Sequence, residues 1–375
     1  MSQTHNSMKK LLKKLHLYLA LALCLPLVLQ GLTGAILVFQ KPISNSLLRQ
    51  NHTFSEGEIQ TPNALITAAQ TQIPEGFSAT LVKLPAEENS PATIRFTKKG
   101  EKTTMLEALI DPVSLEVLKI KNPETDFFRL IKKFHVSLFI PGQSGKNIVG
   151  SFGFVMIFMS LSGLVLWWPK PHNLKRAFTF EFAAKGRRFN RDLHSAIGFW
   201  TLWVLLVTSF AGVFLAFTPA TTATILAIFP GQDLRASASA IKVEPTEKSL
   251  SLDEATSLAK ISVSPDEKLL SLSLPAKKDQ PLRFNFAPKN YSEGEPAITV
   301  FVDQFQQKII EKRDPALFSV GETIVAWQHA LHAGEGLGWL WEITVFTTGF
   351  LPLLFSITGI TMWIQKKRNK ARVKA

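Results

Sequence analysis

The sequence contains a single cysteine, Cys24, among 375 residues. A lone cysteine can form no intrachain disulfide, and without a C-x-x-C-H motif the chain cannot attach haem covalently in the usual c-type manner. Cys24 lies inside a hydrophobic run, where it is best explained as a small apolar residue of a helix. The sequence therefore gives no indication of a disulfide framework or of cysteine-based chemistry.

Charge is nearly absent from four long stretches of the sequence. They run from Leu15 to Phe39, from Ile148 to Trp168, from Ile197 to Phe217 and from Leu340 to Ile364. Each has about the 20 residues that an α-helix needs to cross the hydrocarbon core of a bilayer. The first run follows lysines as a signal peptide does, but it is too long and lacks a small-residue cleavage site. We therefore expect four retained transmembrane helices.

The net charge of +13 is unevenly distributed. Residues 1–14, 169–196 and 365–375 contain 17 of the 42 Lys and Arg residues and only two acids, whereas the segments 40–147 and 218–339 are nearly neutral. Short basic segments remain in the cytoplasm, so both termini and the middle loop are expected there and the two long segments outside. The charge thus reflects topology and indicates no nucleic-acid partner. The short middle loop also lacks a glycine-rich strand-to-helix turn for a nucleotide.

The first and third hydrophobic runs are copies of one another. They align without a gap, and His16 and His194 each stand 18 residues before a glycine, Gly34 and Gly212 respectively. Each run ends in a phenylalanine, Phe39 or Phe217, and a proline stands two or three residues later. Self-similarity of this kind indicates an internal structural repeat.

The second and fourth runs correspond as well, as "SLSGLVLWWPK" and "SITGITMWIQK". Aligned on Gly163 and Gly359, His135 lies 28 residues upstream in one copy and His332 lies 27 residues upstream in the other. His329 has no histidine counterpart in the first copy. The repeat therefore selects His332, and not His329, as the partner of His135. The glycines are expected to let neighbouring helices pack closely against one another. A flat macrocycle wedged between helices would need the same space beside the backbone.

The two long loops also repeat. Residues 61–72 and 250–260 have the pattern of short amphipathic helices, and each is followed by short alternating segments typical of β-strands. Asp111 and Asp303 occupy corresponding turns; we expect them to be turn formers, with ligation of a metal as the alternative. The repeating unit is thus a span, a small α+β domain and a second span.

The repeat matches four of the eight histidines and sorts them by side of the membrane. His16 and His194 lie at the cytoplasmic ends of their spans, and His135 and His332 precede spans on the outer side. Ionisable groups at membrane depth are costly and indicate function, although structural hydrogen bonding remains the alternative. No cysteine or carboxylate cluster accompanies them as a zinc site would require. Two haem b groups, each with two axial histidines, fit better, and such haems favour electron transfer over oxygen activation.

A basic or ionisable residue stands three positions before each matched histidine. Residues at i and i+3 share a helix face, so a cation there could pair with a haem propionate. The alternative is that Lys and Arg gather at cytoplasmic helix ends for topological reasons alone. The four positions are Lys13, Lys132, Arg191 and His329.

Several segments together resemble a known family. They are "LHLYLALALCLPLVLQGLTGAIL", "FHVSLFIPGQSGKNIVGSFGFVMIFMSLSGLVLWWPK", "NRDLHSAIGFW" and "WQHALHAGEGLGW" followed by "SITGITMW". The chain resembles the PepSY-associated transmembrane proteins, which include iron-regulated, PiuB-like proteins of the bacterial inner membrane. The resemblance implies four spans, periplasmic PepSY domains and, in some members, haem-dependent reduction of iron-loaded siderophores. It places the axial ligands at the four histidines that the repeat selects.

The resulting fold class is a membrane α-helical protein with four transmembrane helices in two repeats and two small α+β PepSY-like periplasmic domains. The expected organisation is a first transmembrane helix at 11–40, PepSY-like domain 1 at 41–125, an outer-side histidine-bearing segment at 126–146, a second transmembrane helix at 147–168, a cytoplasmic loop at 169–190, a third transmembrane helix at 191–218, PepSY-like domain 2 at 219–320, an outer-side histidine-bearing segment at 321–338, a fourth transmembrane helix at 339–365 and a cytoplasmic tail at 366–375.

The expected function is electron transfer through two haem b groups from a cytoplasmic-side donor to a periplasmic ferric siderophore, releasing Fe(II). The expected donor is reduced flavin, a separate reductase or quinol, and the other partner is membrane lipid. Two alternatives stay open. One is a cofactor-free PepSY membrane protein that binds or regulates a periplasmic partner, and the other is a siderophore transporter, for which repeated spans are a basis.

Overall fold

The computed structural model describes residues 2–85, 89–98, 104–122, 124–169, 178–179, 181 and 185–374. The chain forms two compact units. The helical unit comprises residues 1–39, 131–221 and 328–375, and the sheet unit comprises residues 40–130 and 222–327. Most of the expected loop at 169–190 lies outside the described residues.

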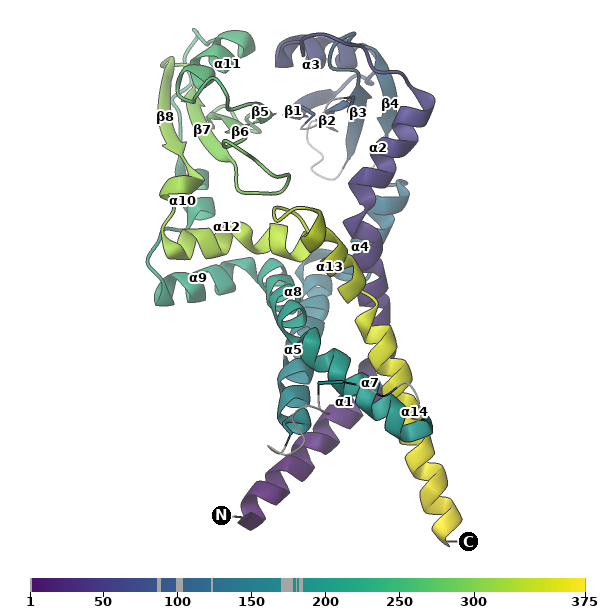
Figure 1. Ribbon diagram of the computed structural model, residues 1–375. Helices are drawn as coiled ribbons and strands as arrows, with labels where there is room; N and C mark the ends of the chain where they lie inside the picture. The colour runs from purple at the N-terminus through teal and green to yellow at the C-terminus, as the bar shows by residue number, and fades with distance from the viewer. Residues whose placement is uncertain are drawn as a thin grey trace. The chain divides into compact units, whose positions relative to one another are not determined.

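The helical unit is built from long apolar helices (Figure 1). Three helical stretches are long and apolar enough to cross a membrane, at Ser7–Val38, Gly142–Trp167 and Trp339–Val373. A fourth candidate is a pair of helices, Gly186–Trp200 and Leu202–Ala216, bent by 63°. Among the described residues the protein therefore has three candidate spans, or four if the bent pair is one. The helices are α1 (Ser2–Val38), α5 (Gly142–Trp167), α7 (Gly186–Trp200), α8 (Leu202–Ala216), α13 (Trp339–Thr348) and α14 (Leu351–Lys374), with α4 (Phe127–Ser137), α9 (Thr218–Ile228) and α12 (Val320–Ala333) extending across the unit boundary.

The third hydrophobic run was expected to form one transmembrane helix at 191–218, but the helix breaks at Thr201. The Thr201 hydroxyl donates to the Ile197 carbonyl oxygen at 2.7 Å, and the Thr201 backbone N–H donates to the Ile197 and Phe199 carbonyls. Hydroxyl back-bonding of this type competes with the regular helix ladder and bends helices. The bend thus coincides with a hydroxyl back-bond and occurs without proline.

Glycines allow the helices of this unit to approach closely. A Cβ on Gly349 would lie 2.6 Å from the Gly31 carbonyl oxygen, and one on Gly153 would lie 2.7 Å from a methyl group of Val213. Neither position can accept a side chain without displacing a neighbour. Small residues at such crossings are how membrane helices obtain close packing.

The sheet unit contains one antiparallel sheet of eight strands, in the order β4-β3-β2-β1-β5-β6-β7-β8. Four strands come from each copy of the repeat, and the copies join where β1 and β5 pair, with Val82 opposite Leu272. The two loops therefore share one sheet, which the sequence pattern did not reveal. The strands are β1 (Phe77–Lys83), β2 (Ala92–Lys98), β3 (Met105–Ile110), β4 (Val117–Lys121), β5 (Leu269–Ser273), β6 (Leu282–Phe286), β7 (Ile298–Asp303) and β8 (Lys308–Arg313).

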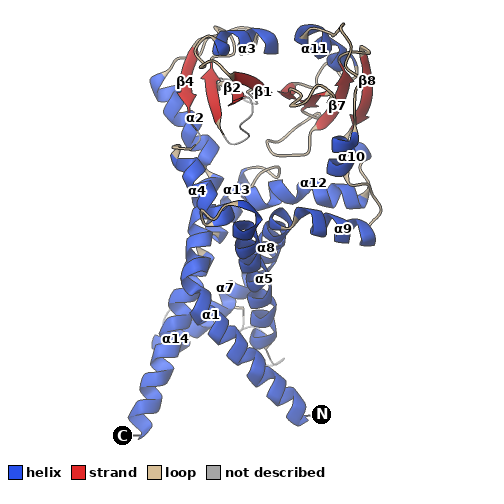
Figure 2. Ribbon diagram, turned by 180° about the vertical axis from the view of Figure 1, so that it is seen from behind, coloured by secondary structure: helices blue, strands red, loops and turns tan. Residues whose placement is uncertain are grey.

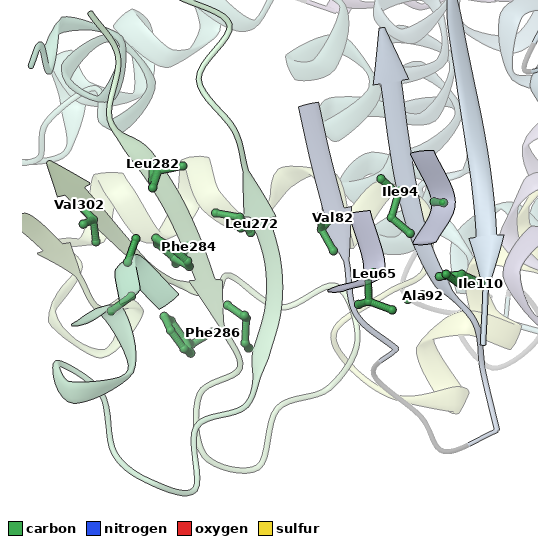
Figure 3. Close-up of a cluster of buried hydrophobic side chains, with 14 of the residues drawn as sticks. Leu65, Val82, Ala92, Ile94, Ile110, Leu272, Leu282, Phe284, Phe286 and Val302 are labelled. Carbon is green, nitrogen blue, oxygen red and sulfur yellow. The ribbon is translucent and has the colours of Figure 1, made fainter. Parts of the chain in front are cut away.

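One face of the sheet packs against two helices (Figure 2). They are α3 (Pro62–Gln70) and α11 (Leu252–Ile261), the helices expected at 61–72 and 250–260, and α11 begins with the Ser251 capping box. Alternate strand residues such as Ile94 and Phe284 are fully buried beneath them (Figure 3). Alternation places the remaining strand residues on the opposite face. The sheet unit also contains α2 (Gln40–Asn51), α10 (Leu234–Ala240) and the short 3-10 helix Pro315–Leu317.

The paired aspartates organise turns, as expected. Asp111 Oδ1 accepts backbone N–H groups of Val113 and Ser114 at 2.8 and 3.1 Å, and its Oδ2 accepts that of Ser55 at 2.8 Å. Asp303 Oδ1 accepts two backbone N–H groups in the same way. Burial alone would raise the pKa of Asp111, but the hydrogen bonds outweigh it and hold the pKa below its ordinary value of 3.8.

Replacing Asp111 by alanine should lower the free energy of unfolding of the sheet unit by about 3 kcal/mol, because buried N–H donors lose their acceptor. Hydrogen exchange should become faster in β3 and β4. Because the folded pKa is depressed, the stabilisation by Asp111 is present above pH 3.8 and is lost as the pH falls through the folded pKa. Glu116→Gln, an exposed change in the same turn, is the control, and equal exchange in both variants would contradict the assignment.

Candidate functional site

His16 and His194 are each anchored to a hydroxyl group on a neighbouring helix. His16 Nδ1 lies 2.8 Å from Ser162 Oγ, which joins α1 to α5. His194 Nδ1 lies 2.8 Å from Thr358 Oγ1, which joins α7 to α14. His16 is also an electrostatic neighbour of His194. The structure thus brings these two histidines together as the repeat predicts.

His135 and His332 form the second pair. His135 Nδ1, on α4, lies 3.0 Å from Thr33 Oγ1 on α1. His332 Nδ1, on α12, lies 2.9 Å from the backbone carbonyl oxygen of Thr208 on α8. The two ring centroids are 6.0 Å apart with an interplanar angle of 44°. All four residues and both rings belong to the helical unit.

A glycine lies beside each of the four rings. A Cβ at these glycines would come within 3.0 to 3.9 Å of a histidine Cε1, so a larger side chain would crowd the ring or occupy the space beside it. The two tightest cases are near enough to force a neighbour to move. The contacts join Gly212 to His332, Gly34 to His135, Gly163 to His16 and Gly359 to His194, which are the glycines that align in the repeat.

The hydrogen bonds constrain the tautomers of the rings. A hydroxyl group has one proton to donate. Ser162, Thr33 and Thr358 each have a backbone carbonyl of their own helix within 2.8 to 3.2 Å as acceptor for that proton. When the hydroxyl donates there, its oxygen accepts from Nδ1–H, and the contacts of these three rings fit a proton on Nδ1 and an unprotonated Nε2. The Thr208 carbonyl can only accept, so His332 carries a proton on Nδ1.

The four anchored histidines are a set of donors that fits haem. No described protein group lies within hydrogen-bond distance of any of the four Nε2 atoms. Two imidazoles bound to one ion, with metal–nitrogen bonds of about 2.0–2.1 Å, would have centroids roughly 6 Å apart, close to the observed distance for His135 and His332. Within the described residues there is no group of three or more His, Cys, Asp and Glu residues that could hold a metal. Two histidines without further protein ligands suit a macrocycle that supplies the remaining donors.

Electrostatics favour the neutral, ligating form of the second pair. His135 and His332 lie on α4 and α12, outside the candidate spans. Burial lowers the pKa of both imidazoles, and the proximity of His332 lowers that of His135 further. Both rings are therefore uncharged near pH 7, as axial ligation requires.

Several buried polar atoms of the helical unit have no hydrogen-bond partner among the described residues. They include Gln30 Oε1 and Trp341 Nε1. The amide nitrogen of Gln30 donates to the backbone carbonyl of His135, so the orphaned oxygen lies close to the second histidine pair. Buried polar atoms normally find partners, and a bound group or ordered water would supply them.

The first two expected propionate partners have different surroundings. Lys13 lines a shallow hollow of about 310 Å³ together with Lys9, Lys10 and Leu166. Arg191 makes an ion pair at 2.8 Å with its neighbour Asp192, and its side chain is 61% exposed. Arg191 thus already has a carboxylate partner, whereas Lys13 lies among other cations.

The other two expected partners lie near the second pair. Lys132 adds positive charge near His135. His329 adds an electrostatic influence on His332; its Nδ1 lies 3.8 Å from Glu335 Oε2, and its side chain is 65% exposed. Although His329 is only three residues from His332, its ring is not among the four anchored ones. The proposed contact of all four residues with propionates stays a prediction.

The hydroxyl groups that orient the histidines were not predicted from the sequence. A signal for them was present, because Thr33, Ser162 and Thr358 each directly precede one of the aligned glycines. The corresponding position in the remaining copy is Ala211, which has no hydroxyl group. This difference explains why His332 donates to a backbone carbonyl instead.

Comparison with known proteins agrees with this architecture. No curated protein matches the chain. Residues 13–366 match the family model described as the PepSY-associated TM region, which covers both units and all four anchored histidines. The chain therefore belongs to the PepSY-associated transmembrane family.

Proposed function

We propose that this protein is a dihaem b-type reductase of the bacterial inner membrane that passes electrons to a ferric siderophore. The observation that carries the proposal is the set of four histidines, each held through Nδ1, with no described protein group hydrogen-bonded to Nε2. His16 and His194 would hold one haem, and His135 and His332 the other. When bound, haem supplies a one-electron couple that the protein itself lacks.

The surrounding residues orient the ligands. Hydroxyl and carbonyl groups fix the ring plane and the tautomer, and such partners also raise the basicity of a metal-bound imidazole. The four glycines keep side chains away from the rings. With both axial positions filled by histidine, dioxygen would find no open site, so electron transfer is favoured over oxygen activation.

The proposed direction of transfer follows from the charge distribution. The basic segments place both termini in the cytoplasm, and therefore His16 and His194 on the donor side. His135 and His332 would then lie on the periplasmic side, near the ferric chelate, which is reduced and releases Fe(II). The electron donor would be reduced flavin, a separate reductase or quinol.

The purified protein should show the reduced-minus-oxidised absorption bands of b-type haem, with two haems per chain. The measurement is an absorption spectrum with haem quantified against protein, after expression with sufficient haem. Absence of these bands would favour a cofactor-free PepSY protein or a siderophore transporter. One haem per chain would restrict ligation to one histidine pair.

Alanine substitution of the histidines should remove haem in pairs, because each haem needs both axial ligands. His16→Ala and His194→Ala should lose the same haem, and His135→Ala and His332→Ala the other. Spectroelectrochemical titration resolves which component disappears, and His52→Ala, a change in the sheet unit, is the control. A crossed pattern of loss would contradict the pairing.

Removing a side chain that orients a histidine should weaken the corresponding site without removing the ligand. Thr33→Val should lower haem retention at the His135–His332 site about tenfold and shift its midpoint potential, because the partner of Nδ1 is lost. Thr208→Val is a matched control, since the Thr208 hydroxyl donates to Val204 while its backbone carbonyl holds His332. Equal effects of the two substitutions would show that the hydroxyl of Thr33 has no orienting role.

A further inference from the structure

The face of the sheet opposite α3 and α11 carries many charged and polar side chains. We call it the open face. Directly paired strand residues point to the same side, so the register defines it. One row across the sheet contains Lys121, Glu107, Arg95, Leu81, Ser273, Arg283, Phe301 and Glu311 in neighbouring positions.

The strand side chains of the open face are predominantly cationic. Seven of them are Lys or Arg, and three are carboxylates. The excess of four positive charges attracts anions and repels cations. The cations are Lys83, Arg95, Lys119, Lys121, Arg283, Lys308 and Arg313, and the carboxylates are Glu107, Asp303 and Glu311.

Arg283 differs from the other arginines of this face. Arg95 pairs with Glu107 at 2.8 Å, and Arg313 pairs with Glu311 at 2.7 Å. The exposed Arg283 donates through Nη2 to Ser273 Oγ at 3.2 Å, and no carboxylate of the described residues lies within ion-pair distance of it. A guanidinium group presents five donors in a planar fork that suits carboxylate-like oxygens.

Hydroxyl and amide groups surround this cation on the central strands. Asn285 donates to Ser271 at 2.8 Å and accepts from Thr299 at 3.0 Å, while Thr80 and Thr97 hydrogen bond at 3.2 Å. These side chains are half-buried, so part of each remains accessible. Such groups can exchange a protein partner for a ligand oxygen at small net cost.

Neighbouring elements limit the open face at both edges. Arg129 contacts Met105 Sδ on β3, and Arg313 on β8 donates to the carbonyl of Leu234 in α10. The accessible part is thus centred on β2, β1, β5 and β6. At about 4.8 Å between strands, these four span roughly 15 Å. This width suits a small molecule better than a protein partner, whose interface is typically about 800 Å² per side.

We propose that the open face binds the ferric chelate as an oxygen-rich anion, with Arg283 as its principal charged contact. The inference rests on the proposed function for the identity of the occupant. The charge excess, the unpaired guanidinium and the row of hydroxyl groups together match anionic chelates such as catecholates and carboxylates. They do not match a cationic chelate.

The test uses chelates of gallium(III), which has the charge of ferric iron but is not reduced, so binding is separated from electron transfer. Full-length protein in nanodiscs of zwitterionic lipid is titrated calorimetrically with an anionic gallium tris-catecholate and a cationic gallium trihydroxamate. The anionic chelate should bind more tightly. Arg283→Gln should weaken its binding about tenfold, because a charge-assisted hydrogen bond is lost, and Arg283→Lys should recover part of the affinity.

Lys312→Gln is the matched control, because Lys312 pairs in register with Val300 of the buried face and its Nζ donates to the Ser262 carbonyl. It should change affinity less than twofold. Equal loss in Arg283→Gln and Lys312→Gln, or equal affinity for both chelates, would overturn the site. Haem content is measured in the same samples. Arg283-dependent binding without haem would refute the reductase and keep the site, whereas two haems without Arg283-dependent binding would refute the site alone.

Discussion

The hydrogen bond from each histidine Nδ1 to the adjacent helix is the interaction on which the helical unit depends. It joins α1 to α5, α7 to α14, α4 to α1 and α12 to α8, so each ring bridges two helices. The bond needs an acceptor and a glycine nearby to leave room for the ring. Together these requirements explain why small and hydroxyl residues stand where the helices meet.

Much of this architecture could be predicted because the repeat leaves a signal in the sequence. Hydrophobic length located the candidate spans, and the nearly equal distances of 28 and 27 residues from histidine to glycine paired His135 with His332. The bend at Thr201 was not predicted, because a break inside an apolar run changes neither the length of the run nor its composition. The pairing of β1 with β5 also escaped, since edge pairing depends on unsatisfied backbone groups rather than on side-chain pattern.

The two copies of the repeat orient the corresponding histidines, His135 and His332, through different acceptor groups. In the first copy α1 continues to Val38 and supplies the Thr33 hydroxyl. In the second copy the equivalent stretch is divided into α7 and α8, and Ala211 replaces the threonine. The orientation of His332 is then set by the path of the α8 backbone, so no single side-chain substitution can remove its partner.

The spacing within one helix connects the two histidine pairs. His16 and Gly34 are 18 residues apart on α1, which corresponds to about 27 Å of helix. That length is close to the roughly 30 Å thickness of the hydrocarbon core. A single span thus carries one histidine near one end and the glycine beside the other pair near the opposite end. Changing the length of this span would separate the pairs, so the distance between the two sites is fixed by the same constraint that makes the helix fit the membrane.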